Sequence, residues 1–442
     1  MPKLDFPQDF LWGASTASYQ VEGATHEGGR SESIWDSFSR RVGGTYAGEN
    51  GDVTCDQYHR YAEDVTLLAS FGFKSYRFSL AWPRILPQGT GPVNKEGVQY
   101  YRNLCAELHA HNIQACATLY HWDLPQCLQD KGGWTERTIV ELFKNYATVC
   151  FEELGDCVDQ WITINEPQCV AYLGHLTGHH APGIVGDVNL AAKTVHHINL
   201  AHGAAVKVYR EKAFLKAPIG TALNINTPRP ATLKPEDIQA AQRARTFEAE
   251  VFLLPLLGKG YPDLSPLGLK LPLQPGDLEL IAQPIDFIGI NYYFEHAVQH
   301  DPQAERTYSN APFWQNRSDM GWPIIPAGLE RQLLWVHEVS GGLPLYITEN
   351  GYAAPDTVVE NRVHDYDRIN YLKKHLAVCA DLIKRGVPLK GYYVWSLLDN
   401  FEWGYGFTKR FGIVYVDYTD QKRIPKDSAY FFRDLIAGYG DY

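Results

Sequence analysis

The sequence lacks any long apolar run. No stretch of about 18 uncharged apolar residues occurs, so a membrane-spanning helix is not expected. Residues 1–5 read MPKLD and do not begin the apolar segment of a signal peptide. The eight cysteines include no C-x-x-C pair, and several stand inside apolar runs, which favours reduced thiols over disulfides. The sequence therefore predicts a soluble, cytoplasmic protein.

Runs of one charge are absent as well. The chain has 40 Lys and Arg against 51 Asp and Glu, a formal net charge of -11, and these charges are dispersed along its length. A protein that binds nucleic acid needs clustered cations to neutralise phosphates. Neither nucleic acid nor a membrane surface is an expected partner.

Aromatic residues, in contrast, are abundant. The 442 residues include 11 Trp, 27 Tyr and 19 Phe. Flat apolar rings with a polar edge suit the faces of sugars, but a large domain also buries many aromatic residues in its core. Composition alone leaves these two explanations open.

No Pro/Ser-rich linker, internal repeat or low-complexity tract divides the chain. Short apolar runs alternate with segments of helical period, as in a parallel sheet covered by helices. The predicted strands span 10–17, 75–81, 114–120, 160–165, 219–225, 287–293, 345–348 and 391–396. The predicted helices include 58–71, 96–111, 136–154, 189–209, 239–254 and 368–385. Eight alternations predict the α/β class and a single (β/α)8 TIM barrel domain over 1–442, with polar insertions at 228–240 and 300–326 forming loops around its mouth.

Two predicted strands end in a glutamate. Residues 163–167 read TINEP and residues 347–351 read ITENG, so Glu166 and Glu349 each stand where an apolar strand stops. A single carboxylate at a strand end is usually a helix cap or a solvated loop residue. Two of them, on the fourth and seventh strands of a barrel, can face one pocket and flank a glycosidic bond. One must then be held protonated by burial and by its neighbour's charge, while the other stays ionised.

The other strand ends carry side chains that suit a sugar. Amides and carboxylates can pair with neighbouring hydroxyls, and an indole can cover the apolar face of the ring. These candidates are Gln20, His121, Trp122, Asn165, Asn291, Tyr293, Trp395, Glu402 and Trp403. Asn165 is suited to the sugar 2-hydroxyl, and Arg77 is expected to form a structural ion pair beneath the glutamates. Taken alone, His121, Trp395 and Trp403 would each fit a core position, but their shared place at strand ends favours the site.

Several motifs extend this pattern along nearly the whole chain. They are FLWGASTASYQVEG (10–23), YRFS (76–79), WPRI (82–85), HWDLPQ (121–126), TINEP (163–167), NYY (291–293), ITENG (347–351) and WSLLDNFEW (395–403). In this combination and order the chain resembles the β-glucosidases of glycoside hydrolase family 1. The resemblance implies that Glu166 is the acid/base and Glu349 the nucleophile.

The resemblance also implies the roles of the remaining residues. Gln20, His121, Asn165, Glu402 and Trp403 would hold the innermost sugar, with Trp395 beneath it, Tyr293 against the nucleophile and Asn291 as the pocket amide. No metal or organic cofactor is implied, and the pairs His179-His180 and His196-His197 are expected to be structural or loop residues. Gln168, Cys169 and His180 would line the leaving-group side.

Three other functions compete with a hydrolase of neutral β-glycosides. A 6-phospho-β-glucosidase needs cations for the phosphate, whereas Glu402 would repel a dianion. A non-catalytic glycan-binding barrel is expected to lose one or both glutamates, and both are present. A transglycosylase shares the covalent intermediate and stays open. The residues also leave open whether glucose, galactose or fucose is preferred, and whether the chain forms a homo-oligomer.

Overall fold

Eight parallel strands close into a barrel at the centre of the computed structural model, which describes residues 4–212, 215–312 and 315–439. Around the barrel the order is β1, β2, β3, β4, β5, β7, β10, β11 and back to β1. Their bounds are β1 (Leu11–Ser15), β2 (Ser75–Ser79), β3 (Gln114–Tyr120), β4 (Gln160–Asn165), β5 (Ile219–Leu223), β7 (Phe287–Asn291), β10 (Leu345–Asn350) and β11 (Leu389–Trp395). The predicted (β/α)8 fold is confirmed, and every predicted strand overlaps an observed one.

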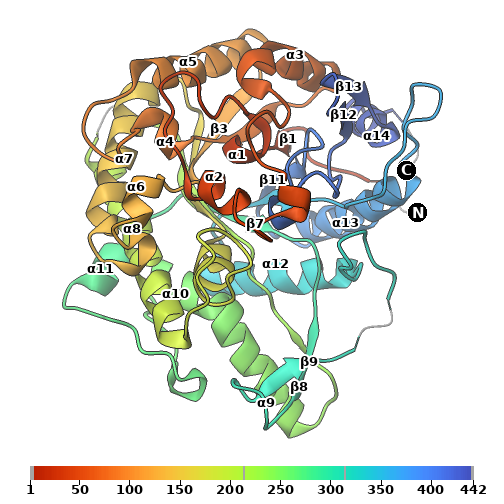
Figure 1. The fold of residues 1–442 in the computed structure, drawn as a ribbon. Helices are drawn as coiled ribbons and strands as arrows, with labels where there is room; N and C mark the ends of the chain where they lie inside the picture. The colour runs from red at the N-terminus through yellow and green to blue at the C-terminus, as the bar shows by residue number, and fades with distance from the viewer. Residues whose placement is uncertain (1–3, 213–214, 313–314, 440–442) are drawn as a thin grey trace.

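Helices surround the barrel (Figure 1). The longer ones are α3 (Gln57–Ser70), α5 (Lys95–Ala110), α7 (Ile139–Leu154), α8 (Val188–Glu211), α12 (Pro326–Ser340), α13 (Tyr366–Lys384) and α14 (Asp427–Ile436). Short helices lie in the connections between barrel strands, namely α1 (Ser18–Val21), α2 (Ile34–Ser39), α4 (Trp82–Ile85), α6 (Gln126–Gln129) and α11 (Asp277–Ile281). Five of the six predicted helices agree with observed ones to within three residues at each end.

The segment after β5 differs from its prediction. The helix expected over 239–254 is α9 (Pro235–Arg245), a π-helix (Thr246–Glu250) and α10 (Val251–Leu256) in succession. Only the first part of the insertion 228–240 is therefore outside a helix. α9 begins at Pro235 because a proline and the acidic Glu236 and Asp237 favour the start of a helix. The insertion 300–326, whose residues 313–314 lie outside the described part, contributes β9.

Both insertions contribute a strand to a small second sheet. It joins β6 (Arg229–Pro230), β8 (Ala297–His300) and β9 (Tyr308–Asn310), and it lies with α9 at one edge of the molecule (Figure 1). A separate hairpin of β12 (Val414–Asp417) and β13 (Lys422–Pro425) follows the last barrel strand.

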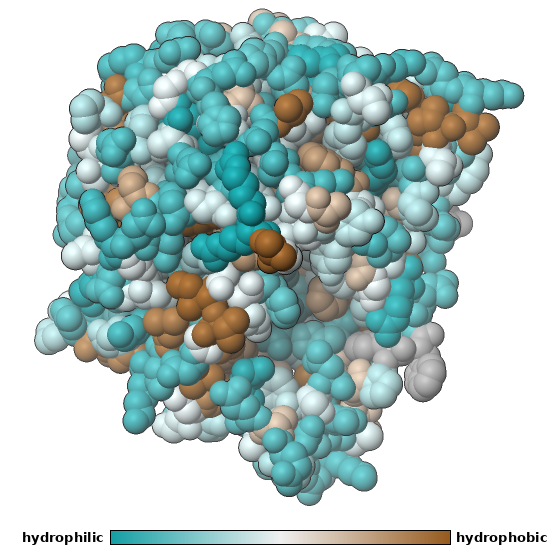
Figure 2. Space-filling model, viewed as in Figure 1, coloured by the Kyte–Doolittle hydropathy of each residue, from teal (hydrophilic) through white to brown (hydrophobic). Residues whose placement is uncertain are grey.

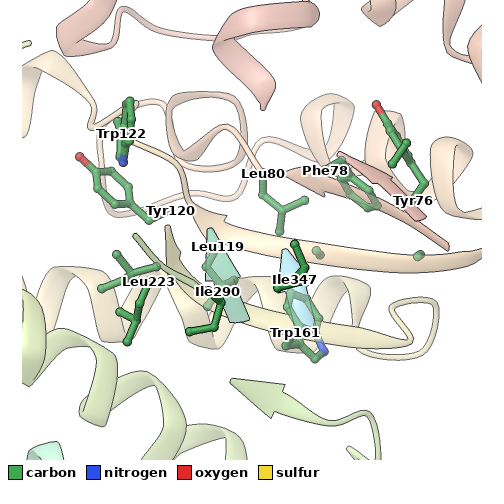
Figure 3. Packing of buried hydrophobic residues seen from close by; sticks show 14 of the residues in the cluster. Tyr76, Phe78, Leu80, Leu119, Tyr120, Trp122, Trp161, Leu223, Ile290 and Ile347 are labelled. Carbon is green, nitrogen blue, oxygen red and sulfur yellow. The ribbon is translucent and has the colours of Figure 1, made fainter. Parts of the chain in front are cut away.

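The buried apolar residues of the described chain form four clusters, and two of them show how the barrel is packed. Cys116, Ile162, Ala222, Phe287 and Tyr393 come from five different barrel strands and form one small cluster. A much larger cluster includes other residues of the barrel strands, such as those of β2, β3, β4, β5, β7 and β10 labelled in Figure 3. The interior of the barrel is therefore filled with side chains, and ligands of this fold bind at the open end formed by the carboxyl ends of the strands.

Tyr393 crosses the barrel interior. Its hydroxyl lies 2.9 Å from Ser75 Oγ and donates to Gln160 Oε1 at 3.1 Å, so it links β11 to β2 and β4. Gly13 on β1 is paired with Tyr393, and a Cβ at Gly13 would stand 2.3 Å from the tyrosine ring. The glycine is needed because the ring occupies the space where a side chain would be.

The face of the molecule drawn in Figure 2 is mostly hydrophilic, with a few hydrophobic groups gathered near its middle. All eight cysteines lie in the described ranges and are free thiols. Among the helices described, none combines the length and the apolar character needed to cross a membrane.

Gly13→Ala should destabilise the barrel because the new methyl group overlaps the Tyr393 ring. We expect the free energy of unfolding to fall by about 1–3 kcal/mol, as for other overpacked cores, measured by urea unfolding. Gly404→Ala is the matched control, since its Cβ would meet no atom closer than 3.8 Å. Equal stability of the two variants would contradict this account.

Candidate active site

Both strands that carry the predicted glutamates lose their regular pairing just where the glutamates stand. The pairing of β4 with β5 shifts between Ile162 and Asn165, directly before Glu166. The pairing of β10 with β7 shifts between Ile347 and Glu349. Such irregularities re-aim side chains and are common beside active sites. Here they occur at the open end of the barrel.

Glu349 is held by two donors. Arg77 Nη1 donates to its Oε1 at 2.6 Å, and the Tyr293 hydroxyl donates to its Oε2 at 2.6 Å. The Glu349 side chain is 4% exposed and that of Arg77 is 0% exposed. Burial raises the pKa of Glu349, and the charge and hydrogen bond of Arg77 and the Tyr293 hydroxyl oppose that rise. The ion pair expected for Arg77 is present.

Among the residues described, no cation contacts Glu166 directly. Asn291 Nδ2 donates to its Oε1 at 2.7 Å, and Cys169 Sγ donates to its Oε2 at 3.1 Å. Burial, and then the charge of Glu349, raise the pKa of Glu166 to about 7. The two carboxyls therefore have different surroundings, as acid and nucleophile roles require.

A chain of amides joins these groups. Arg77 Nη2 donates to Asn165 Oδ1 at 2.6 Å, and Asn291 Nδ2 donates to the same oxygen at 3.0 Å. Asn165 Nδ2 in turn donates to His121 Nε2 at 3.0 Å. Asn165 thus has a structural role between Arg77, Asn291 and His121, in addition to any contact with a sugar.

His121 is neutral and presents a free nitrogen. Burial, with the charge of Arg77, lowers its pKa well below the usual value. Because Nε2 accepts from Asn165, the ring proton lies on Nδ1, and this buried nitrogen has no hydrogen-bond partner among the described residues. It is a donor left for a ligand.

Three tryptophans shape the cavity around His121. The rings of Trp395 and Trp403 are near-parallel to the His121 ring, at 5.9 and 6.0 Å between centroids. Trp122 lies 4.6 Å from Trp403 and donates from its indole to Asn165 O at 2.8 Å. All three indoles are more than nine-tenths buried, so a ligand would meet rigid apolar faces.

Glu402 and Gln20 lie beside these rings. Gln20 Nε2 donates to Asn400 Oδ1 and Phe401 O at 3.1 and 2.8 Å, which leaves its buried Oε1 without a partner in the described chain. Burial, followed by the charges of Glu349 and Glu166, raises the pKa of Glu402 to about 8. The charged carboxylate expected from the sequence is therefore mostly protonated at neutral pH in the free protein.

Buried ion pairs hold the loop that carries Glu402. Lys426 Nζ lies 2.7 Å from Asp399 Oδ1 and 2.5 Å from Asp356 Oδ2, and Arg368 pairs with Asp356 at 2.6 Å. Arg410 contacts the other oxygen of Asp399 at 2.7 Å. These contacts anchor the segment after β11 to α13 and to the end of the β12–β13 hairpin.

A cavity of about 690 Å³ receives many of these groups, and this volume is typical of a small-molecule site. Of the predicted residues, it is lined by His121, Trp122, Glu166, Tyr293, Glu349, Trp395, Glu402 and Trp403. Gln20, Arg77, Asn165 and Asn291 lie directly behind this wall, and each is 0% exposed. A second hollow of about 750 Å³, between α13, α14 and β13, contains none of the predicted residues.

The outer cavity includes residues that the sequence did not reveal. The cavity is also lined by Gln168, Cys169 and His180, together with Tyr172, Asn224, Asn226, Glu248, Phe294, Met320, Trp322, Tyr405 and Phe411. Asn224 directly follows β5, so the strand-end rule could have found it. Trp322 lies in the insertion 300–326, where no periodicity gave a signal.

Three residues of the cavity wall other than glycine have left-handed backbone conformations. The φ angles are 47° at Glu166, 78° at Trp122 and 48° at Trp403. Such values are uncommon for residues other than glycine, and they persist only where the surrounding structure enforces them. Their gathering around one cavity agrees with a functional site there.

The histidine pairs have separate roles. His196 bonds to Asp277 at 2.8 Å and His197 to Trp134 O at 2.9 Å, both within the structural core. His179 and His180 belong to a loop that reaches the cavity. No group of three or more His, Cys, Asp or Glu side chains suited to a metal ion occurs within the described ranges.

Comparison with known proteins gives consistent matches. The sequence model of glycosyl hydrolase family 1 matches residues 3–440. Beta-glucosidase A of Acetivibrio thermocellus is 45% identical over 100% of both chains, and a bifunctional beta-D-glucosidase/beta-D-fucosidase of Bifidobacterium breve is 40% identical over 98% of both. A Thermotoga maritima family 1 glycoside hydrolase, solved with a cyclophellitol analogue transition state mimic, has a TM-score of 0.96 and 46% identity over 99% of each chain.

Glu402→Gln should make stability less dependent on pH. The folded pKa of Glu402, about 8, lies above the ordinary value of 4.5, so the wild type loses stability as pH rises from about 4.5 to 8. The glutamine cannot ionise. The free energy of unfolding of Glu402→Gln relative to that of the wild type should therefore rise across this pH range, by a few kcal/mol at most. Urea unfolding at pH 5, 7 and 8.5 measures this difference.

Met320→Leu is the control, because it changes the same cavity without removing a titratable group. Its offset from the wild type should be the same at each pH. Parallel curves for Glu402→Gln and the wild type would show that Glu402 is not the group responsible.

Proposed function

Because the chain belongs to glycosyl hydrolase family 1, we propose that this retaining β-glucosidase uses Glu349 as nucleophile and Glu166 as acid/base. The observation that carries the proposal is the unequal pairing of the two carboxyls. Glu349 is bound to a guanidinium, whereas the Glu166 carboxyl accepts hydrogen bonds from the neutral donors Asn291 and Cys169. An ionised nucleophile and a protonated acid need these two environments.

In the first step, a carboxylate oxygen of Glu349 attacks the anomeric carbon and forms a covalent glycosyl-enzyme. Glu166 gives its proton to the glycosidic oxygen, which leaves with the aglycone. Arg77 and the Tyr293 hydroxyl hold the attacking carboxylate in place, since both contact it at 2.6 Å. Little reorganisation is then needed at the moment of reaction.

In the second step, water replaces the sugar on Glu349. The negative charge of Glu349 is lost in the covalent intermediate, and with it one of the two causes that raise the pKa of Glu166. Glu166 therefore ionises more readily and takes a proton from the attacking water. Two displacements at one carbon retain the β configuration.

The inner end of the cavity suits a neutral hexose. The proton on His121 Nδ1, the free Oε1 of Gln20 and the carboxyl of Glu402 supply donors and acceptors for hydroxyls. Trp395 and Trp403 supply faces for the C-H side of the ring. We assign Gln20, His121, Glu402 and Trp403 to the sugar, with Trp395 beneath it. Asn165 and Asn291 act mainly by orienting His121 and Glu166.

The outer end suits a leaving group that combines apolar and polar parts. Tyr172, Phe294 and Trp322 offer rings, while Asn224 and Asn226 offer amides. Short oligosaccharides and aryl glycosides both fit this mixture. The similarity to a bifunctional glucosidase/fucosidase supports some tolerance in the sugar as well.

We also infer that the whole chain is one catalytic domain that acts in the cytoplasm. The closed barrel, to which segments from both ends of the chain contribute, supports the first inference. The eight free cysteines support the second, because thiols persist in reducing compartments. Two rival functions fit less well. A 6-phospho-β-glucosidase needs a cation for the phosphate, and the loop 399–405 carries none. A barrel that only binds glycans is not expected to keep both glutamates.

Azide should distinguish the roles of the two glutamates. Glu166→Ala should slow cellobiose hydrolysis by about 10²–10⁴-fold, but slow an activated nitrophenyl glucoside much less, because that leaving group needs little protonation. Added azide should then give a β-glucosyl azide, identified by proton NMR. Glu349→Ala should lose the covalent intermediate and give the α-azide instead.

Glu248→Ala is the matched control, since Glu248 lines the same cavity outside the pair. It should show neither azide product. A β-azide from Glu349→Ala would require the two assignments to be exchanged.

A 6-phosphoglucoside should be a poorer substrate than the neutral glucoside. The loop 399–405 reads DNFEWGY and carries no cation to neutralise a phosphate, and the carboxylate of Glu349 would repel a dianion in the same cavity. We expect kcat/KM to favour p-nitrophenyl glucoside over its 6-phosphate. Glu402→Ser removes one carboxyl from the cavity, and it should therefore bring kcat/KM for the 6-phosphate closer to that for the neutral glucoside. Faster turnover of the phosphorylated substrate by the wild type would overturn the assignment of a neutral sugar.

A further inference from the structure

The two oxygens of Glu166 have different neighbours. Oε1 accepts from Asn291 Nδ2 at 2.7 Å, and Oε2 lies 3.1 Å from Cys169 Sγ. Glu166 is 4% exposed and Cys169 is 9% exposed, so bulk water does not replace these partners. The two contacts decide which oxygen can carry a proton.

The orientation of Asn291 follows from Arg77. A guanidinium only donates, so the Asn165 atom that faces it at 2.6 Å must be the carbonyl oxygen Oδ1. Asn291 approaches the same oxygen at 3.0 Å and must therefore present its NH₂ group. One N–H of that group is directed to Asn165 and the other to Glu166 Oε1. Arg77 thus orients Asn165, and Asn165 orients Asn291, so that an N–H of Asn291 points at Glu166 Oε1.

An oxygen that faces an N–H donor at 2.7 Å has no room for a proton of its own on that line. We propose that the transferable proton of Glu166 resides on Oε2, and that Cys169 is a positioning residue for it. The sulfur accepts weakly from the protonated acid and donates its S–H to the carboxylate, so it is a partner in both states. This inference rests on the proposed role of Glu166 as acid/base.

Local backbone structure brings the thiol to this oxygen. Glu166 has a φ of 47°, and Cys169 N donates to Glu166 O at 3.0 Å, which closes a tight turn. A π-helix (Cys169–Gly174) begins at the cysteine, and helices of this rare type often mark functional sites. The other seven cysteines are not among the residues that line the cavity.

Several charged or titratable groups share the surroundings of Glu166. Glu349 on β10 and Glu402 after β11 are acidic, Arg77 on β2 is cationic, and Tyr293 after β7 carries a hydroxyl. Burial and Glu349 raise the pKa of Glu166, and the hydrogen bonds from Asn291 and Cys169 lower it. Removal of the thiol should therefore raise this pKa while the other groups stay in place.

The test compares Cys169→Ala and Cys169→Ser with the wild type, using pH profiles of kcat/KM. In Cys169→Ala the basic limb should move to higher pH by a few tenths of a pH unit, whereas Cys169→Ser should keep it at or below the wild-type position, because a hydroxyl also donates. Cys379→Ala, which removes a buried thiol on α13, should leave the limb unchanged.

Leaving-group dependence gives a second readout. If Cys169 positions the acid proton, Cys169→Ala should lower kcat/KM severalfold more for cellobiose than for a nitrophenyl glucoside, and Cys169→Ser should restore most of that difference. An unchanged basic limb in Cys169→Ala, or an equal loss on both substrates, would overturn the inference. If Cys169→Ala does not fold, a basic limb at higher pH in Cys169→Ser would overturn it.

Glu166→Ala separates this inference from the proposed function. If the basic limb disappears in Glu166→Ala but is unmoved in Cys169→Ala, only the role of Cys169 is wrong. If the limb persists in Glu166→Ala, the assignment of Glu166 as acid/base is itself wrong.

Discussion

The Arg77 guanidinium is the contact on which the rest of the site depends. It lies wholly buried in the barrel and donates to Glu349, to Thr348 O and to Asn165. Its charge offsets the burial of one carboxylate, which would otherwise be strongly unfavourable. Because the guanidinium can only donate, it also sets the orientation of Asn165. Asn165 in turn leaves the ring proton of His121 on Nδ1 and turns an N–H of Asn291 toward Glu166. One cation therefore sets charge, tautomer and hydrogen-bond direction together.

The site contains three buried carboxyl groups, and the single positive charge of Arg77 cannot neutralise all of them. Glu166, Glu349 and Glu402 share a cavity, and burial raises the pKa of each. This arrangement opposes stability at neutral and alkaline pH, since the unfolded chain would ionise these groups freely. The surrounding aromatic walls and the buried ion pairs around Asp399 hold the cavity open despite that opposition. Keeping these reactive carboxyls out of water therefore lowers the free energy of unfolding of the barrel.

Much of the fold follows from patterns that are local in sequence. Buried parallel strands appear as apolar runs, and the strand bounds at 114–120 and 160–165 agree with β3 and β4 residue for residue. Helices with one apolar face are found to within a few residues. The insertions at 228–240 and 300–326 and the helix expected over 239–254 were predicted least well. That helix is interrupted by a π-helix, and the small sheet pairs short segments that lie far apart in the chain.

The sequence by itself determined the barrel, the glutamate pair and the type of side chain at each strand end, because residue type and spacing are enough to specify strands, turns and the end of the barrel where they meet. Only the tertiary structure decided what each group contacts. It placed Asn165 and Asn291 behind the cavity wall, where they hydrogen-bond His121 and Glu166. It also buried Glu402 beside two other carboxyls, which raises its pKa, and brought Cys169 into contact with Glu166. Hydrogen-bond direction and pKa depend on distances between segments far apart in the chain, and such distances exist only after folding.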